Sequence, residues 1–225
     1  MRLLHTADWH LGRLFHNLSL LDDQRHVLQQ LLEIIDREQV DAVLVAGDIY
    51  DRSVPPAAAV TLLDEILGEL CEKRGLPVVM ISGNHDGAER LGFGARHLRQ
   101  AGLHILTDLA TCDQPVTLTI GDDTVDVFGI PYADPEYVRS AFGVDVRDFD
   151  SAHRYLLERI EAQRQPPDAT DEPLFCGWRH LQRLRAPAHP RRCRKRGVGT
   201  HAEFRLRGVG PPSRPPDSRW GAHSL

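Results

Sequence analysis

The sequence predicts an α/β fold built around a parallel sheet, and two patterns support this prediction. The first is a layout that occurs three times before residue 87: a short apolar run ends in a small residue and is followed by Asp, Asn or His. Short runs rich in Val, Ile and Leu that stop at such loops are typical of buried strands. The second pattern is the helical spacing of apolar residues between these runs, which predicts crossover helices.

The first two strand–helix units account for residues 1–74. The first strand ends just before Asp8, and apolar residues then recur at nearly helical spacing over residues 20–39. The second strand, residues 42–46, ends at Gly47. Pro56 opens the second helix, which is expected to continue to Arg74, and Gly75 and Pro77 are its stop signals.

A third strand, residues 77–82, completes a βαβαβ arrangement. A third helix is then expected over residues 88–101, although it contains Gly92 and Gly94. The later elements are a short strand at 104–106, a hairpin of strands 116–120 and 124–130, and helices at 135–141 and 150–163.

Composition limits the class of protein. Hydrophobic residues make up 41% of the 225 residues, which is enough for a packed core. No apolar run approaches the roughly 18 residues of a membrane span, and the chain runs directly into a strand rather than a signal segment. A cytoplasmic protein without a membrane segment is therefore expected.

Charge divides the chain at about residue 173. The whole sequence has 27 basic and 32 acidic residues, but residues 174–225 hold 12 basic and 2 acidic ones, which leaves 15 and 30 for residues 1–173. The basic segment is rich in Pro and Arg and shows neither helical nor strand periodicity. We therefore expect a folded domain at 1–173 and, at 174–225, a tail that is disordered or translated out of frame.

The three polar loops predict a metal site. Strand ends lie along one edge of a parallel sheet, so these loops are expected to bring together Asp8, His10, Asp48, Asn84 and His85. Carboxylate, imidazole and amide oxygen suit Mn²⁺, Mg²⁺, Fe or Zn²⁺, and this many ligands suits two ions. Each residue alone would also fit a loop cap that bonds backbone amides, but three such loops in order favour the metal site.

The motifs in these loops carry a family resemblance. Asp-x-His, Gly-Asp-x-x-Asp and Gly-Asn-His-Asp, each after a strand, resemble the calcineurin-like metallophosphoesterase superfamily. The longer strings MRLLHTADWHLGR, AGDIYDRSVPP and ISGNHD resemble the SbcD family within it, the nuclease subunits of bacterial SbcCD complexes. The resemblance covers about three quarters of the chain. It implies a metallophosphoesterase-type β-sandwich flanked by helices, whose second half is incomplete here.

The metal ligands can be divided between two ions. A carboxylate has two oxygens and the Asp48 strand is the middle one of the three, so Asp48 is expected to bridge both ions, as the matching residue does in the superfamily. Asp8 and His10 would hold one ion and Asn84 the other. The resemblance implies two divalent ions, Mn²⁺ ahead of Mg²⁺.

Three more residues are expected to act around the ions. By resemblance, His85 faces the substrate and stabilises the transition state or protonates the leaving group. Asp86 is expected to orient the imidazole of His85. Asp51 is a candidate for a supporting contact behind the ligands.

The resemblance also implies partners and a role. SbcD-like proteins cleave DNA as double-strand exonucleases and single-strand endonucleases in end processing, repair and recombination. They work with the SbcC ATPase, as a homodimer within a heterotetramer. Two alternatives remain open: a small-molecule phosphodiesterase or phosphatase of the same superfamily, and an inactive chain whose basic tail binds nucleic acid.

The tail lacks motifs that the resemblance would place there, namely a strand ending in His and a Gly-His-x-His loop. Codons can be chosen for residues 204–214 such that the neighbouring frame reads Phe-Asp-Tyr-Val-Ala-Leu-Gly-His-Leu-His. This supports the hypothesis that the reading frame shifts between about Pro167 and Cys176. The hypothesis would be wrong if the uninterrupted gene encodes the same tail in frame.

Overall fold

The computed structural model describes residues 1–163 in full and the backbone of two further strands at 174–177 and 181–183. These residues all belong to one compact unit of the chain, Met1–Pro187. The arginine-rich cluster at 191–196 and the segment of the frame-shift hypothesis lie outside the described residues. Among the described helices, none combines the length and the hydropathy that a membrane span requires.

The first sheet is parallel and has the order β1-β4-β5-β6, which confirms the α/β class. Its strands are β1 (Leu3–Thr6), β4 (Ala42–Ala46), β5 (Val78–Ile81) and β6 (Leu103–Leu106). Every residue of β4 and β5 is buried, as expected for the central strands of a sheet covered on both faces. The β4 strand lies between β1 and β5, as the sequence predicted.

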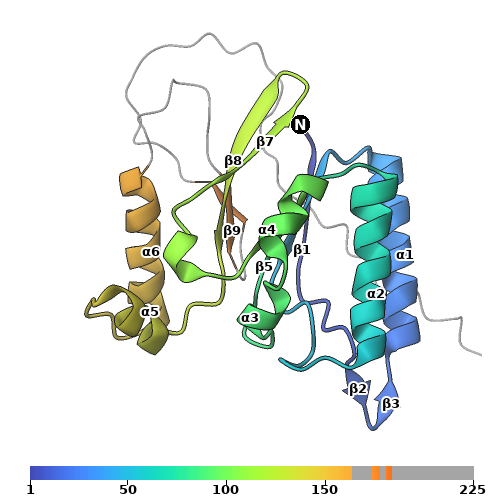
Figure 1. The fold of residues 1–225 in the computed structure, drawn as a ribbon, viewed down its shortest axis with the longest axis horizontal. Coiled ribbons are helices and arrows are strands. Elements are labelled where there is room, and N and C mark those ends of the chain that lie inside the picture. The colour runs from blue at the N-terminus through green and yellow to red at the C-terminus, as the bar shows by residue number, and fades with distance from the viewer. Residues whose placement is uncertain (164–173, 178–180, 184–225) are drawn as a thin grey trace, which may run out of the picture. The chain divides into compact units, whose positions relative to one another are not determined.

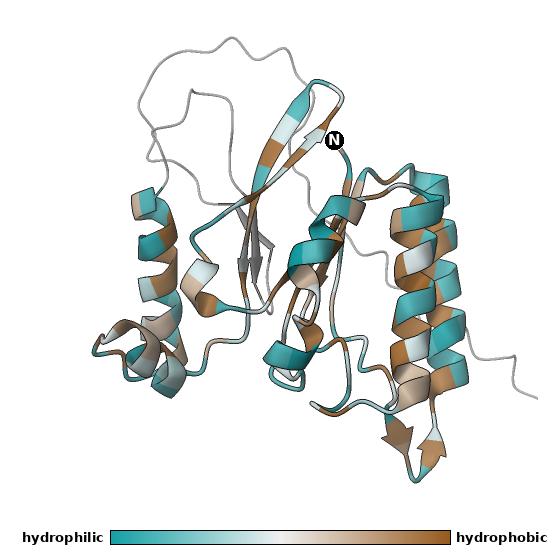
Figure 2. Cartoon of the chain, in the orientation of Figure 1, coloured by the Kyte–Doolittle hydropathy of each residue, from teal (hydrophilic) through white to brown (hydrophobic). Residues whose placement is uncertain are grey.

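Helices cover one face of this sheet. The α1 helix (Leu21–Glu38) and the α2 helix (Ala57–Leu67), which a π-helical turn (Gly68–Lys73) extends, lie side by side in Figure 1. Because side chains alternate along a strand, Val43 and Val45 point to the core under these helices, while Leu44 points to the opposite face. Figure 2 shows that both helices carry hydrophobic and hydrophilic residues, as helices with one buried face do.

The opposite face packs on a second sheet of order β10-β9-β8-β7, which gives the predicted sandwich. Its strands are β7 (Val116–Ile120), β8 (Asp123–Ile130), β9 (Leu174–Gly177) and β10 (Leu181–Arg183). The β7–β8 hairpin is the predicted one. A Cβ atom on Gly129 would lie 2.5 Å from Leu106 Cδ1 and 2.9 Å from Ile81 Cγ2, so glycine permits the close approach of the two sheets.

The expectation that the chain has no regular structure from residue 174 is wrong for two short segments. The β9 strand pairs in parallel with β8, and β10 pairs antiparallel with β9. Strands of four and three residues are too short to show a period, and their stabilising bonds come from the backbone of neighbouring strands. The second sheet therefore extends beyond the predicted domain boundary at 173.

The single helix expected over residues 88–101 is divided. The structure has α3 (Ala88–Leu91), α4 (Ala95–Leu98) and a 3₁₀ turn (Arg99–Ala101). Gly94, which directly precedes α4, has a φ angle of 73°, a left-handed conformation that a continuous α-helix cannot contain and that glycine adopts without strain. The sequence did not predict the β2–β3 hairpin (Leu14–Phe15 with Leu18–Ser19), which precedes α1.

The last two described helices form a second apolar cluster with the end of β8. They are α5 (Pro135–Phe142), capped by the Asp134 side chain, and α6 (Phe149–Gln163), both close to their predicted bounds. A 3₁₀ turn (Leu109–Thr111) also joins this cluster. Arg159 of α6 forms an ion pair of 2.7 Å with the buried Asp113, which joins the segment that follows this turn to the helix.

We expect His5 to make stability depend on pH. It lies partly buried in β1, its Nε2 is buried with no hydrogen-bond partner in the described part of the chain, and burial lowers the pKa of its imidazole. In the unfolded chain the pKa of histidine is about 6.5, so below that pH the unfolded state binds the proton first. Neutral His5 therefore makes its full contribution to the free energy of unfolding above pH ~6.5. This contribution is lost as the pH falls below the pKa of the unfolded state toward the lower pKa of the folded state.

Urea unfolding between pH 5 and 8 in EDTA measures this effect. The free energy of unfolding should fall more steeply toward acid in the parent protein than in His5→Gln, which stays neutral. His104, whose pKa burial also lowers, offers a second variant, His104→Gln, expected to act in the same direction. Equal slopes for the parent and His5→Gln would show that His5 is not the group responsible.

Candidate metal centre

The loops that follow β1 and β4 are joined by backbone hydrogen bonds that continue the parallel pairing of the two strands. Asp8 N donates to Gly47 O (3.1 Å), His10 N to Asp48 O (2.9 Å) and Leu11 N to Ile49 O (2.9 Å). In Figure 1 these loops leave the sheet at the same end as the loop after β5. The three predicted loops therefore do converge at one edge.

Three of the predicted site residues have left-handed backbone conformations. The φ angles are 57° for Asp8, 45° for His10 and 48° for Asp48. Such conformations cost a non-glycine residue of the order of 1 kcal/mol or more each, and they concentrate at functional sites. Here the hydrogen bonds between the two loops hold all three residues in these conformations.

Asp8, His10 and Asp48 form the first of two ligand clusters. His10 Nε2 lies 3.9 Å from Asp8 Oδ1 and 3.8 Å from Asp48 Oδ2, and the three ligand atoms lie within 4.8 Å of one another. These distances are too long for hydrogen bonds. Two metal–ligand bonds of about 2.1 Å separate their donor atoms by at most about 4.2 Å, so both distances lie within the reach of one divalent ion held by two carboxylate oxygens and one imidazole nitrogen.

The two carboxylates of this cluster differ in exposure. The Asp48 side chain is 5% exposed, whereas that of Asp8 is 58% exposed. Asp48 Oδ1 accepts a hydrogen bond from the backbone N–H of His85 (3.0 Å), and its other oxygen faces His10. Gly83 makes this approach of the β4 and β5 loops feasible, because a Cβ atom there would lie 2.2 Å from Asp48 Oδ1. Asp48 thus lies at the centre of the three loops.

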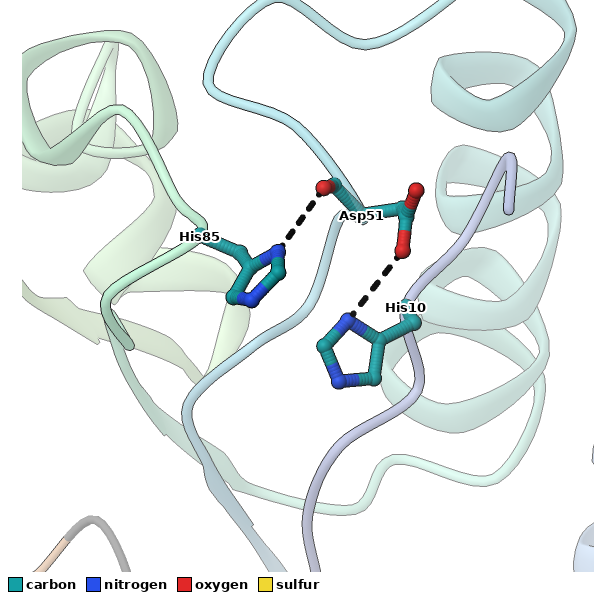
Figure 3. Close-up of side chains that lie close together, drawn as sticks. All are labelled: His10, Asp51 and His85. Atoms are coloured by element: carbon teal, nitrogen blue, oxygen red, sulfur yellow. Dashed lines mark hydrogen bonds and ion pairs between the residues drawn. The ribbon is translucent and has the colours of Figure 1, made fainter. Parts of the chain in front are cut away.

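The second cluster contains His10, Asp51 and His85 (Figure 3). His10 Nδ1 faces Asp51 Oδ1 at 3.5 Å, and His85 Nδ1 lies 2.9 Å from Asp51 O. The two imidazole rings lie edge to face with centroids 4.8 Å apart. Because Asp51 occupies the Nδ1 side of His10, the Nε2 atom of His10 is the one that faces the two carboxylates of the first cluster.

Asp86 does not have the contacts that the sequence predicted. Its carboxylate accepts hydrogen bonds from the backbone N–H groups of Tyr50, Ile49 and Gly83. The imidazole of His85 instead contacts the carbonyl oxygen of Asp51 through Nδ1. Burial raises the pKa of the Asp86 carboxyl, against the lowering by these three N–H groups. The expectation that Asp86 orients His85 is therefore wrong, because the Asp86 carboxylate is committed to the backbone of two loops.

The remaining predicted ligand, Asn84, is exposed in the loop between Gly83 and His85. Asn84 directly precedes His85, whose N–H donates to Asp48, and its role as a ligand stays a prediction.

Two arginines lie near the second cluster. Arg13 and Arg52 are each 4.0 Å from Asp51. These two guanidinium groups bring positive charge to an otherwise acidic cluster.

Sequence reasoning missed one residue that supports the first loop. Gln24 of α1 donates from Nε2 to the carbonyl oxygens of Trp9 (3.1 Å) and His10 (2.6 Å), and its Oε1 accepts from Gly12 N (3.0 Å). A glutamine on an amphipathic helix gives no signal of this kind in the sequence. Its contacts become visible only when the helix and the loop are placed together.

Comparison with known proteins places the chain among phosphoesterases. The model of the family described as calcineurin-like phosphoesterase matches residues 1–191. The curated relatives include two proteins named as the D component of the nuclease SbcCD. The one from Staphylococcus epidermidis is 39% identical over 163 residues, and the one from Staphylococcus saprophyticus subsp. saprophyticus is 40% identical over 162 residues.

Both alignments cover 72% of this chain but only 42% and 41% of the relatives, so the chain spans about two fifths of the length of the curated relatives it matches. The family model, in contrast, matches most of the chain and includes all three loops of the candidate metal centre. With the α/β sandwich and the clustered carboxylates and imidazoles, this match shows that the chain belongs to the calcineurin-like phosphoesterase family.

Proposed function

We propose that the chain contributes the metal centre of a DNA nuclease subunit of the SbcD type, which hydrolyses phosphodiester bonds. The observation that carries the proposal is the convergence of Asp8, His10 and Asp48 within 4.8 Å of one another at the edge of the parallel sheet. The names of the two staphylococcal relatives, which describe part of a nuclease, support a nucleic acid over other phosphate esters as the substrate class, and we propose DNA.

The proposed ions are two divalent cations, with Mn²⁺ ahead of Mg²⁺. Asp8, His10 and Asp48 would hold one ion, and Asp48 and Asn84 would contribute to the other. When bound, such a pair supplies positive charge for the phosphoryl oxygens and an acidified water as nucleophile. The oxygen and nitrogen donors of this chain fit that ion class.

His85 is the proposed proton donor to the leaving oxygen. Its Nδ1 faces a backbone carbonyl, Asp51 O, which can only accept, so Nδ1 carries a hydrogen. The Nε2 atom is then the nitrogen that gains or releases a proton. Asp51 therefore orients His85 through its backbone carbonyl, and its side-chain carboxylate faces Nδ1 of His10 at 3.5 Å.

The proposed setting is DNA end processing, repair and recombination in the cytoplasm, with double-strand exonuclease and single-strand endonuclease action. The proposed partners are DNA and an SbcC-type ATPase subunit, in a heterotetramer that contains an SbcD-type homodimer. The name of the two relatives, which makes them one component of a nuclease called SbcCD, supports a partner of this kind.

A cleavage assay with three substrates tests the function. The chain is incubated with end-labelled linear duplex DNA, with single-stranded circular DNA and with bis(4-nitrophenyl) phosphate, each with Mn²⁺, with Mg²⁺ and with EDTA. The proposal predicts Mn²⁺-dependent cleavage of both DNAs that EDTA abolishes. Cleavage of the nitrophenyl ester alone would instead indicate a small-molecule phosphodiesterase. Salt-sensitive DNA binding without cleavage would indicate a nucleic-acid-binding chain.

A further inference from the structure

We propose that Asp86 is a positioning residue of the metal centre: its buried carboxylate holds the β4 and β5 ligand loops against each other. The inference rests on the proposed function, because it concerns the spacing of the ligands that the two loops supply. Asp86 is 9% exposed, and it belongs to neither of the two ligand clusters.

The hydrogen bonds of Asp86 reach both loops. Oδ1 accepts from Tyr50 N (2.9 Å), while Oδ2 accepts from Ile49 N (3.1 Å) and from Gly83 N (2.8 Å). Ile49 and Tyr50 directly follow Asp48 in the chain, and Gly83 directly precedes Asn84. One carboxylate therefore fixes the backbone beside the proposed bridging ligand to the backbone beside the proposed ligand of the second ion.

The β1 loop is connected to the same carboxylate through one residue, Ile49. The N–H of Ile49 donates to Asp86, and the carbonyl oxygen of Ile49 accepts from Leu11 N at 2.9 Å. Leu11 directly follows His10. A displacement of Ile49 would consequently move the loop that carries Asp8 and His10, so the contacts of Asp86 extend to all three loops.

Three backbone donors require a group that only accepts hydrogen bonds. An ionised carboxylate meets this requirement, whereas an asparagine amide would present an NH₂ group to at least one backbone N–H. Asp86→Asn therefore keeps the shape of the side chain and sets its NH₂ group against Tyr50 N in one orientation, or against Ile49 N and Gly83 N in the other, so it weakens the hold on the β4 loop in either case. Asp113 provides a matched control: it is also 9% exposed, and it pairs with Arg159 in the α5–α6 cluster rather than with the ligand loops.

The test is a Mn²⁺ titration of the full chain followed by electron paramagnetic resonance, with thermal unfolding in EDTA to verify folding. The parent and Asp113→Asn should bind two Mn²⁺ ions and show the spectrum of a spin-coupled pair. Asp86→Asn should lose the coupled spectrum and bind the second ion at least about tenfold more weakly. Asp86→Glu, which keeps the charge but lengthens the side chain, should give an intermediate result.

The outcomes separate the two proposals. If the parent and Asp86→Asn give the same coupled spectrum and affinities, the positioning role is wrong and the proposed function stands. If the parent itself binds no coupled pair, the two-ion function fails and the positioning role fails with it. If both Asp86 variants fail to fold while Asp113→Asn folds, Asp86 serves global stability, which also overturns the positioning role.

Discussion

Asp48→Asn should reduce Mn²⁺-dependent phosphodiester cleavage by at least about 1,000-fold, at the upper end of the loss from removing one transition-state contact. Asp48 is the most buried of the candidate ligands, one of its oxygens is bonded to His85 N, and the other faces His10. An amide has one oxygen and no negative charge, so it cannot replace a carboxylate that serves two ions. The measurement is the initial rate on linear duplex DNA at saturating Mn²⁺.

The control for Asp48→Asn is the same substitution at Asp113, which is also buried but belongs to the α5–α6 cluster. Asp113→Asn should leave cleavage within about twofold of the parent, because the two sites share no contact that would couple them. Cleavage that survives in Asp48→Asn would show that the metal centre is not built on the β4 loop.

His85→Ala should lower the rate of cleavage by about 100- to 10,000-fold, the usual contribution of a general acid, while Mn²⁺ binding changes little. The reason is the division of roles in the structure: His10 Nε2 faces the carboxylates, whereas His85 is fixed through Nδ1 to Asp51 O and keeps Nε2 for a proton. The measurements are the cleavage rate against pH and a Mn²⁺ titration by calorimetry. The pH profile should lose the limb that reports the proton donor.

The exposed His97 of α4 provides the comparison for this variant. His97→Ala should leave both the rate and the Mn²⁺ affinity unchanged. If His85→Ala instead abolishes Mn²⁺ binding, His85 is a metal ligand, as its place in the second cluster with His10 and Asp51 also permits, and the assignment of proton donor is wrong.

The main frame of the fold could be predicted from the sequence because parallel strands leave strong local signals. The β4 and β5 strands are continuous apolar runs. The loop after β4 begins with Gly47, and the loop after β5 begins with Ser82 and Gly83. Once such strands are assigned to one sheet, their ends must lie at one edge. The grouping of Asp8, His10 and Asp48 follows from that rule alone.

The remaining features depend on contacts between distant segments. In the sequence, the Asp86 carboxylate has two possible kinds of partner: the imidazole of the neighbouring His85, or backbone N–H groups far away in the chain. The packing of the β4 and β5 loops decides for the N–H groups of Tyr50 and Ile49, which lie 36 and 37 residues earlier. Gln24 supports a ligand loop from a helix face that looks ordinary in the sequence. The β9 strand is stabilised by pairing with β8 rather than by its own pattern, so local periodicity could not reveal it.

Anomalous X-ray scattering at the manganese edge, from crystals of the chain grown with saturating Mn²⁺, tests the metal centre most directly. The expected result is a manganese peak bounded by Asp8 Oδ1, His10 Nε2 and Asp48 Oδ2, the three atoms of the first ligand cluster. A second peak beside Asp48 toward the Asn84 loop would complete the proposed pair. No peak at the first cluster under these conditions would contradict the assignment of these residues as a metal centre.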